Sequence, residues 1–347
     1  MKILLYLCEK YDIMQGKALM TAAMVALAAV MPASVSAQRT TGAEEATFAA
    51  AYIYSFIQNT VPLSFCVHDV DYETLYPEHV YDPVNFDCKV FGPMHHQGWG
   101  YTRACVIPTV IRVGMYSMHP KEMTNAAFQQ TGIKSLDMRA RIRTIPQNAF
   151  MFCTDLETVK FHGDAPHFIE ASAFRGCTKL RLVEGLPAQL KYIGDDAFNQ
   201  CLALTEIYIP KDVEYIGPRA FNYCQSLSKV EFATGHFRRI PEECFNCCDK
   251  LREITIPEGV ESLGKNAFNY SGLEKITLPA TMHALYDGCL SQTPLKDIYI
   301  HATTPPGVGR VFTGRQINSI VLHVPASAID AYRSDPFWRL FPHIQPM

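Results

Sequence analysis

The sequence predicts a solenoid, in which one short structural unit is repeated and each copy stacks on the next. Three observations predict it. An aromatic slot recurs every 22 to 24 residues, an apolar residue stands five positions before each later slot, and a short strand pattern follows each slot. A repeated unit that cannot bury its apolar face alone must stack on its neighbours.

The aromatic slot is the clearest mark of the repeat. Similar segments, such as SAFRGCTKL (172–180) and RAFNYCQSL (219–227), recur along the chain. The slot holds Phe128, Phe150, Phe174, Phe198, Phe221, Phe245, Phe268 and finally Leu290. The apolar residues five positions upstream are Ile145, Ile169, Ile193, Ile216, Ile240, Leu263 and Leu285. Two apolar positions kept in phase over so many copies exclude coincidence.

A strand follows each slot. Segments such as LTEIYI (204–209) and LREITI (251–256) alternate apolar and polar residues, and Pro210, Pro257 and Pro279 end three of them. Period-two alternation with β-branched residues is typical of strands. We therefore expect one parallel sheet along the stack. The third copy, LRLVEGLP, places Gly185 where an apolar residue is usual, so a regular strand is not expected there.

Small residues with a hydrogen to donate occupy the third position after every slot. They are Thr131, Cys153, Cys177, Cys201, Cys224, Cys248, Ser271 and Thr293. After each Cys the first Leu of the strand comes three residues later, whereas after Thr or Ser the gap is two and contains Gly or Pro. This covariation indicates that backbone geometry selects the position. We expect a structural ladder of compact groups that contact buried carbonyls inside the turn.

The segment CFNCC (244–248) has the Cys-x-x-Cys spacing that is typical of a redox or zinc site. The repeat register assigns Cys248 to the ladder and Cys244 to a slot that usually holds Ala, which leaves only Cys247 without a structural role. A structural zinc ion needs four ligands, and no second cysteine or histidine pair is in phase with these residues. Ladder thiols that point the same way, about 4.8 Å apart, do not meet disulfide geometry. We therefore predict buried, reduced thiols, no metal and no cofactor.

Two rows of residues point outward from the predicted strands. The first row reads Ser135, Thr158, Leu182, Glu206, Lys229, Glu253, Lys275 and Asp297, and its charges alternate in sign from Glu206 onward. Opposite charges on neighbouring strands are favourable. This row is expected to neutralise itself and to keep the sheet in register and soluble.

The second outward row reads Asp137, Lys160, Glu184, Tyr208, Glu231, Thr255, Thr277 and Tyr299. Tyrosine brings a large contact area with little loss of entropy, so five of these residues form the candidate ligand-binding surface. They are Tyr208, Glu231, Thr255, Thr277 and Tyr299; His301 and His323 are weaker candidates. The alternative is that these tyrosines reflect only the strand preference of aromatic residues.

The N-terminus resembles a secretory signal. Lys17 precedes an apolar run at 18–31, and small residues at Val35 and Ala37 predict cleavage after Ala37. Translation is expected to begin at Met14. The apolar run is too short to span a bilayer permanently. Residues 1–37 are thus a predicted signal peptide, and the mature protein is expected to be exported to the periplasm, the cell surface or the medium. Disulfides can form there.

Residues 38–104 contain no repeat and are predicted to form an N-terminal cap on the open end of the stack or a small extra domain. Thr41 and Glu44 form a capping box, and Phe48, Tyr52 and Phe56 follow at the spacing of an amphipathic helix. Three cysteines, Cys66, Cys88 and Cys105, are expected to include one disulfide, but the sequence does not identify the pair. The repeat array is placed at 105–300 and a C-terminal cap at 301–347.

Sites for chemistry are few. The segments HDVDYE (68–73) and MHHQGWG (94–100) contain Asp69, Asp71, His95 and His96, which could contact a cation, but they lack the spacing of known metal motifs. Trp99 could stack on a sugar or simply pack locally. The chain has no G-x-S-x-G, H-E-x-x-H, P-loop or dinucleotide motif, which argues against an enzyme. A net charge of -3 argues against nucleic acid as a partner.

The repeat resembles the BspA-type leucine-rich repeats, whose word is I-G-x-x-A-F-x-x-C-x-x-L-x-x-[IV]-x-[IL]-P, over residues 105–347. The resemblance implies a right-handed α/β-type leucine-rich-repeat solenoid, mostly β with short helical turns, whose strands line the concave side. It also implies adhesion at a bacterial surface. We therefore expect an exported, non-enzymatic module that binds a protein or glycan. The alternatives are a structural spacer or assembly component without a ligand, and a metal-dependent activity in the N-terminal segment.

Overall fold

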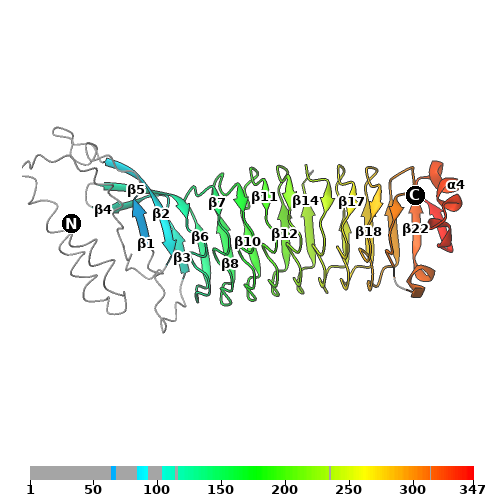
Figure 1. Cartoon of the computed structure of the whole chain (residues 1–347), viewed down its shortest axis with the longest axis horizontal. Helices are drawn as coiled ribbons and strands as arrows, with labels where there is room; N and C mark the ends of the chain where they lie inside the picture. Colours follow the sequence, from blue (N-terminus) through cyan, green and yellow to red (C-terminus); the bar gives the residue numbers. More distant parts are fainter. Residues whose placement is uncertain (1–63, 68–83, 93–103, 114–115, 234–235, 313) are drawn as a thin grey trace, which may run out of the picture.

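The protein is an elongated stack of short strands, seen in a computed structural model (Figure 1). The structure describes residues 64–67, 84–92, 104–113, 116–233, 236–312 and 314–347. The predicted signal peptide, the start at Met14 and the predicted helix around Phe48 lie outside these ranges. Among the described residues, no helix combines the length and the apolar character needed to cross a bilayer.

The predicted strands form a ladder along the stack, in which every pairing is parallel. Alternation sets the two sides of each strand, because Ile207 and Ile209 are buried while Glu206 and Tyr208 are exposed. We call the outward side of this ladder the long-strand face. Its members are β3 (Ala104–Ile107), β6 (Ser135–Met138), β8 (Thr158–Phe161), β10 (Leu182–Glu184), β12 (Glu206–Ile209), β14 (Lys229–Phe232), β16 (Glu253–Thr255), β18 (Lys275–Leu278), β20 (Asp297–Ile300), β22 (Val321–Val324) and β23 (His343–Pro346).

The expectation of one parallel sheet was wrong, since a second ladder of two-residue strands accompanies the first. All but the last of these strands end on the buried apolar residue five positions before a slot, and the residue before it is at least partly exposed except at the buried Ser262. Stacking also brings these backbones within hydrogen-bonding distance. We call the outward side the short-strand face. Its strands are β7 (Thr144–Ile145), β9 (Phe168–Ile169), β11 (Tyr192–Ile193), β13 (Tyr215–Ile216), β15 (Arg239–Ile240), β17 (Ser262–Leu263), β19 (Ala284–Leu285) and β21 (Gly307–Val308).

Both ladders are interrupted. The long-strand ladder breaks between β10 and β12 and between β14 and β16, and the short-strand ladder breaks between β13 and β15. The first break lies at Gly185, where the sequence predicts an irregular strand. Gly185 has a φ of +70°, and a Cβ placed there would lie 2.4 Å from the carbonyl oxygen of Phe161. The repeat pattern does not predict the other two breaks.

The turns around the slots are not helical, contrary to the implication of the resemblance. Residues two positions before and two positions after each slot have positive φ values, for example Asn148 at 59° and Phe152 at 58°. The N–H groups of Asn148, Phe150 and Phe152 donate to carbonyls of the next copy at 3.1, 2.8 and 2.7 Å. Left-handed residues cost about 1–2 kcal/mol each, and these inter-copy hydrogen bonds offset that cost.

The core is a column of phenylalanine rings that runs the length of the repeats. Every slot phenylalanine is fully buried, and neighbouring rings stack with centroids 5.0 to 5.4 Å apart. Such offset stacks add about 0.5–1.5 kcal/mol per pair beyond the burial of apolar area. The column keeps the copies in one register and therefore holds both outward faces rigid.

The C-terminal end of the stack is closed by short helices (Figure 1). These are η2 (Gly314–Ser319), η3 (Ala326–Ala328), α4 (Ile329–Ser334) and η4 (Trp338–Leu340). Trp338 and Tyr332 are fully buried. The Trp338 indole donates to the Pro306 carbonyl at 2.9 Å, and the Tyr332 hydroxyl donates to the Ala302 carbonyl at 2.9 Å. Paired polar groups allow these large rings to cover the apolar end.

Before the repeats, the described residues form a four-stranded sheet. Its order is β1 (Ser64–Val67), β2 (Val84–Gly92), β5 (Tyr116–Met123) and β4 (Ile111–Val113), while β3 joins the repeat ladder. Cys105 on β3 is buried and free, so it takes no part in the predicted disulfide. Cys66 and Cys88 lie on β1 and β2, which pair antiparallel.

Candidate functional site

The cysteines after the slots line one buried column. The thiol of each donates to the carbonyl oxygen of the slot residue one copy earlier, at 2.9 to 3.4 Å. The donors are Cys153, Cys177, Cys201, Cys224 and Cys248, and the acceptors are Phe128, Phe150, Phe174, Phe198 and Phe221. Thr131 and Thr293 instead donate to the slot carbonyl of their own copy at 2.8 Å. Ser271 Oγ is buried without a hydrogen-bond partner in the described part of the chain.

The environment of this column disfavours the thiolate form of the cysteines. Burial raises the pKa of Cys153 to about 11 and raises the pKa of Cys177, Cys201 and Cys248 well above the ordinary value. The thiolate is the form that attacks electrophiles and binds metals. All nine cysteines from Cys105 onward are free. Among the described residues, no group of three or more His, Cys, Asp or Glu side chains could hold a metal ion.

Cys247 acquires a structural place that sequence reasoning missed. It lies two positions after its slot, where its φ is 57°, and its side chain is half-buried. The equivalent position holds Tyr223 in the copy before and Tyr270 in the copy after. The Tyr223 hydroxyl is hydrogen-bonded to Cys247, and burial raises the pKa of the Cys247 thiol. In the same segment, Cys244 and Cys248 are fully buried.

The first outward row of the long-strand face is only partly neutralised by its neighbours. The register places Glu206 beside Lys229 and Glu253 beside Lys275. Lys275 lies 3.9 Å from Glu253, whereas Lys229 pairs at 2.7 Å with Glu231 on its own strand. Exposed pairs of this kind contribute about 0–1 kcal/mol. They therefore leave the face available for other contacts.

The five candidate binding residues occupy the same strand position in five successive copies, with a break in strand pairing between the second and the third. Tyr208 is 51% exposed on β12 beside Glu231 on β14. Thr255, Thr277 and Tyr299 are aligned on β16, β18 and β20, beyond the break after β14. Tyr208 and Tyr299 are four copies apart, which corresponds to about 19 Å at the usual strand spacing.

Tyr299 is engaged by its own neighbours. Its ring stacks on the His323 imidazole with centroids 4.0 Å apart, and the Lys275 ammonium lies 5.4 Å from its centroid. His323 Nε2 lies 2.8 Å from Asp297 Oδ1, and His323 Nδ1 lies 3.2 Å from Gln345 Nε2. The His323 side chain is only 12% exposed. The geometry is that of an internal polar cluster, so of the two tyrosines only Tyr208 offers open ring surface.

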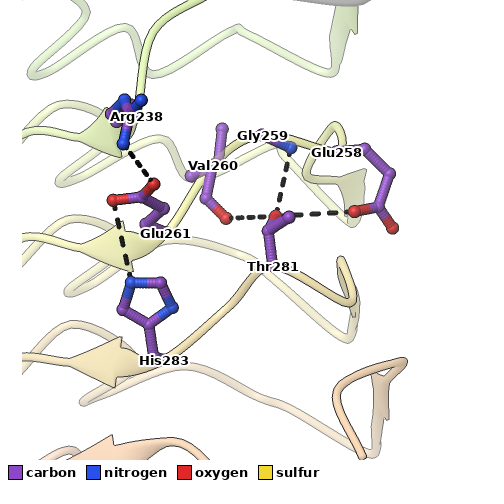
Figure 2. A network of polar contacts seen from close by, with 7 residues as sticks. All are labelled: Arg238, Glu258, Gly259, Val260, Glu261, Thr281 and His283. Carbon is purple, nitrogen blue, oxygen red and sulfur yellow. Dashed lines mark hydrogen bonds and ion pairs between the residues drawn. The ribbon is translucent and has the colours of Figure 1, made fainter.

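Polar groups on the segments that lead into β15, β17 and β19 form hydrogen bonds and ion pairs with one another, as Figure 2 shows. Arg238 donates to Glu261 at 2.7 Å, and His283 lies 3.7 Å from the same carboxylate. The hydroxyl of Thr281 donates to the Val260 carbonyl at 2.9 Å and accepts from the Gly259 N–H at 3.1 Å. Each contact joins neighbouring copies and stabilises their stacking.

A second aromatic row escaped the sequence reasoning. Phe168, Tyr192 and Tyr215 are aligned on β9, β11 and β13, and the rings of Tyr192 and Tyr215 stack with centroids 4.7 Å apart. The signal was present in the sequence as an aromatic residue six positions before the slot in three successive copies. The repeat pattern was defined by the buried position five residues before the slot, so the exposed position beside it was not predicted to form a row.

The chain belongs to the BspA-type leucine-rich repeat family. Six copies of the family described as "BspA type Leucine rich repeat region" match residues 117–201, 164–238 and 191–318. Repeats of this family are typical of bacterial surface proteins, in which they form binding or repeat modules.

Solved structures of bacterial leucine-rich repeat proteins are similar to the chain. One from Bacteroides ovatus ATCC 8483 shares 20% identity with a TM-score of 0.55, over 85% of this chain and 77% of that one. A leucine-rich repeat protein of T. pallidum shares 26% identity with a TM-score of 0.47, over 53% of this chain and 81% of that one. A leucine rich cell surface protein of Faecalibacterium prausnitzii A2-165 shares 16% identity with a TM-score of 0.30, over 89% and 95%. No curated protein matches the chain.

Proposed function

We propose that this protein is an exported, non-enzymatic module that binds a protein or glycan ligand through the long-strand face. Membership of the BspA-type family supports a binding role, and the predicted signal peptide supports export. The observation that carries the proposal is Tyr208, a large aromatic side chain that is 51% exposed on a rigid strand.

The surroundings of Tyr208 suit a recognition site. Within the described part of the chain, Tyr208 has no ring partner, in contrast to Tyr299. The exposed side chains of Glu206, Lys229 and Glu231 on β12 and β14 surround it with both signs of charge. A rigid aromatic anchor with a polar rim is the usual composition of an interface hot spot. Adhesion to a host or bacterial surface is the biological role that we assign to such a contact.

A structural spacer or assembly component is the second candidate function. The observation that favours it is the set of polar contacts between neighbouring copies, such as Arg238 with Glu261 and Lys191 with Glu214 at 3.0 Å. In a spacer these contacts would be the purpose of the surface, and no exposed aromatic residue would be needed. A ligand that depends on Tyr208 separates the two functions.

A metal-dependent activity in the N-terminal segment remains a prediction, because Asp69, Asp71, His95 and His96 lie outside the described residues. Its test is elemental analysis of the purified protein. A stoichiometric metal that is lost when both histidines are replaced would support this activity.

The proposed function is tested by screening the purified protein against arrays of immobilised extracellular-matrix proteins and glycans. Any hit is repeated with Tyr208→Ala and with the control Tyr270→Ala, whose side chain is 58% exposed away from the long-strand face. We expect Tyr208→Ala to abolish the hit and Tyr270→Ala to leave it. A hit that survives Tyr208→Ala overturns the proposed site, and the absence of any hit favours the spacer.

A further inference from the structure

The short-strand face carries an aromatic pair in an unusual position. Tyr192 and Tyr215 are opposite each other on β11 and β13, with ring planes 7° from parallel. β13 is the last strand of its ladder, because the hydrogen-bonded register does not continue to β15. Tyr215 is 40% exposed, and its only ring contact among the described residues is with Tyr192. Within the described part of the chain, the other face of the Tyr215 ring therefore has no aromatic or cationic partner.

Two carboxylates border this pair. Asp195 Oδ1 accepts a hydrogen bond from the Tyr215 hydroxyl at 3.1 Å. Burial raises the pKa of Tyr192, and the negative charges of Asp195 and Glu170 raise it further, while the Glu170 carboxylate itself accepts the Gln147 N–H at 3.1 Å. Negative charge is thus concentrated at the hydroxyl end of the stacked rings.

These two carboxylates have weaker polar contacts than a salt bridge, since Glu170 accepts the Gln147 N–H at 3.1 Å and the charge of Arg219 also acts on Asp195. Within the described part of the chain, Asp195 and Glu170 have no ion-pair partner, whereas other acids around them do. Glu214 pairs with Lys191 at 3.0 Å, Asp196 with Arg219 at 3.0 Å, and Glu261 with Arg238 at 2.7 Å. Asp195, which has no salt bridge among the described residues, thus lies at the hydroxyl of the same Tyr215 ring.

We propose that Tyr192, Tyr215, Asp195 and Glu170 form a second interaction surface, which takes an arginine or lysine side chain from a basic segment of a partner protein. A cation within about 6 Å of a tyrosine centroid is attracted to the ring, and a carboxylate accepts charge-assisted hydrogen bonds from the same cation. A glycan would use the rings and hydroxyls but would not neutralise the negative charges of Asp195 and Glu170. Charge complementarity therefore selects a cationic partner.

The chain uses the same chemistry on this face itself. The Arg143 guanidinium lies 5.6 Å from the Phe168 centroid, and the Arg239 guanidinium lies 5.8 Å from the Tyr286 centroid. Arg143 directly precedes β7, and Arg239 is the first residue of β15. The Tyr215 ring has no such cation among the described residues. An arginine or lysine of the partner would therefore take the place that Arg143 has over Phe168 and Arg239 has over Tyr286.

This surface is separate from the one proposed for function. The Tyr208 site lies on β12 of the long-strand ladder, and the Tyr215 site lies on β13 of the short-strand ladder. A module with both sites could hold two partners at once. Failure of either proposal would leave the other intact.

The probe for the test is a fluorescein-labelled peptide of alternating Arg and Gly, with alternating Gln and Gly as the neutral control. Anisotropy titrations of the purified protein are run at low salt and again above about 0.3 M salt, where the Debye length is below about 6 Å. We expect the Arg peptide to bind more tightly than the Gln peptide, and we expect its affinity to fall as the salt concentration rises. Asp195→Asn and Tyr215→Ala should each weaken it about fivefold or more.

Matched controls make each outcome decisive. Tyr270→Ala and Glu258→Gln should leave the affinity unchanged, and urea unfolding verifies that every variant is folded. Equal binding of the two peptides, or binding that survives both Asp195→Asn and Tyr215→Ala, overturns the proposal. Binding of neutral oligosaccharides that is lost in Tyr215→Ala but kept in Asp195→Asn would also overturn it, in favour of a glycan site.

Discussion

The thiol of Cys201 donates a hydrogen bond to the carbonyl oxygen of Phe174, 3.3 Å away in the preceding copy. The same carbonyl accepts the N–H of Cys177 at 3.2 Å, so the thiol supplies its second partner and joins two copies. A hydrogen bond that recurs from one copy to the next explains why cysteine occupies this position without any catalytic role.

Removing one thiol from the column should destabilise the protein. Cys201→Ala deletes the hydrogen bond to Phe174 and leaves a small cavity in a fully buried site. The loss of one net hydrogen bond costs about 0.5–1.5 kcal/mol, and a cavity of one heavy atom adds about 1 kcal/mol. We expect the free energy of unfolding in urea to fall by about 1.5–2.5 kcal/mol. The half-buried Cys247→Ala is the control, and an equal loss there would contradict the account.

Cysteine reactivity should identify Cys247 within the described part of the chain. Native protein treated with iodoacetamide should carry the label at Cys247 and not at Cys153, Cys177 or Cys201, because those thiols are fully buried. Since burial raises the pKa of Cys247, its labelling rate should keep increasing as the pH passes about 8.5, the ordinary thiol value. Peptide mass spectrometry measures both. Native-state labelling of the column, or disulfides between its members, would refute a buried ladder.

Two glycines with left-handed backbone offer a matched pair. Gly185 has a φ of +70° and a Cβ position blocked by the Phe161 carbonyl, whereas Gly163 has a φ of +76° and open space around it. Gly163→Ala should cost about 1–2 kcal/mol for the left-handed conformation alone. Gly185→Ala should cost clearly more, because the backbone must also move. Urea denaturation of both variants checks the order, and equal losses would show that the close approach at Gly185 is unimportant.

Acid should weaken the start of the repeat array through Asp137. Partial burial tends to raise the pKa of this carboxyl, but the hydrogen bond and charge of Arg139, with a contribution from His162, lower it below the ordinary value. A pKa lowered by folding stabilises the protein above the unfolded value of about 3.9, and this contribution is lost as the pH falls through the folded value. Asp137→Asn should thus flatten the decline in urea midpoint below about pH 4. A decline identical to that of the wild type would remove Asp137 as its source.

The periodicity in the sequence predicted the stack and the buried column of Phe150, Phe174 and Phe198, because side chains that repeat in phase must face the same interior. It also indicated the irregular strand at Gly185. The short-strand ladder was not predicted, since two-residue strands leave no alternation to detect. The break in pairing between β14 and β16, which falls between Glu231 and Thr255 of the predicted binding row, was not predicted either, because no residue type in the repeat marks it.

The repeat pattern also could not predict the contacts of Tyr299. Its partner His323 lies in the C-terminal region, where the repeat no longer aligns residues, and only the register of β20 with β22 brings the two rings together. Asp297 and Gln345 then hold the imidazole on either side. Residues outside the repeat thus decide which tyrosine of the predicted binding row remains open.

The measurement that tests the central claim most directly is the affinity of a screened ligand for the wild type, Tyr208→Ala and Tyr299→Ala, with circular dichroism to verify folding. Truncating a hot-spot tyrosine costs about 2 kcal/mol or more, which is about 30-fold in Kd. We predict that loss for Tyr208→Ala and little change in affinity for Tyr299→Ala, because His323 and Lys275 already cover that ring. Full affinity in folded Tyr208→Ala would contradict binding through the long-strand face at this site.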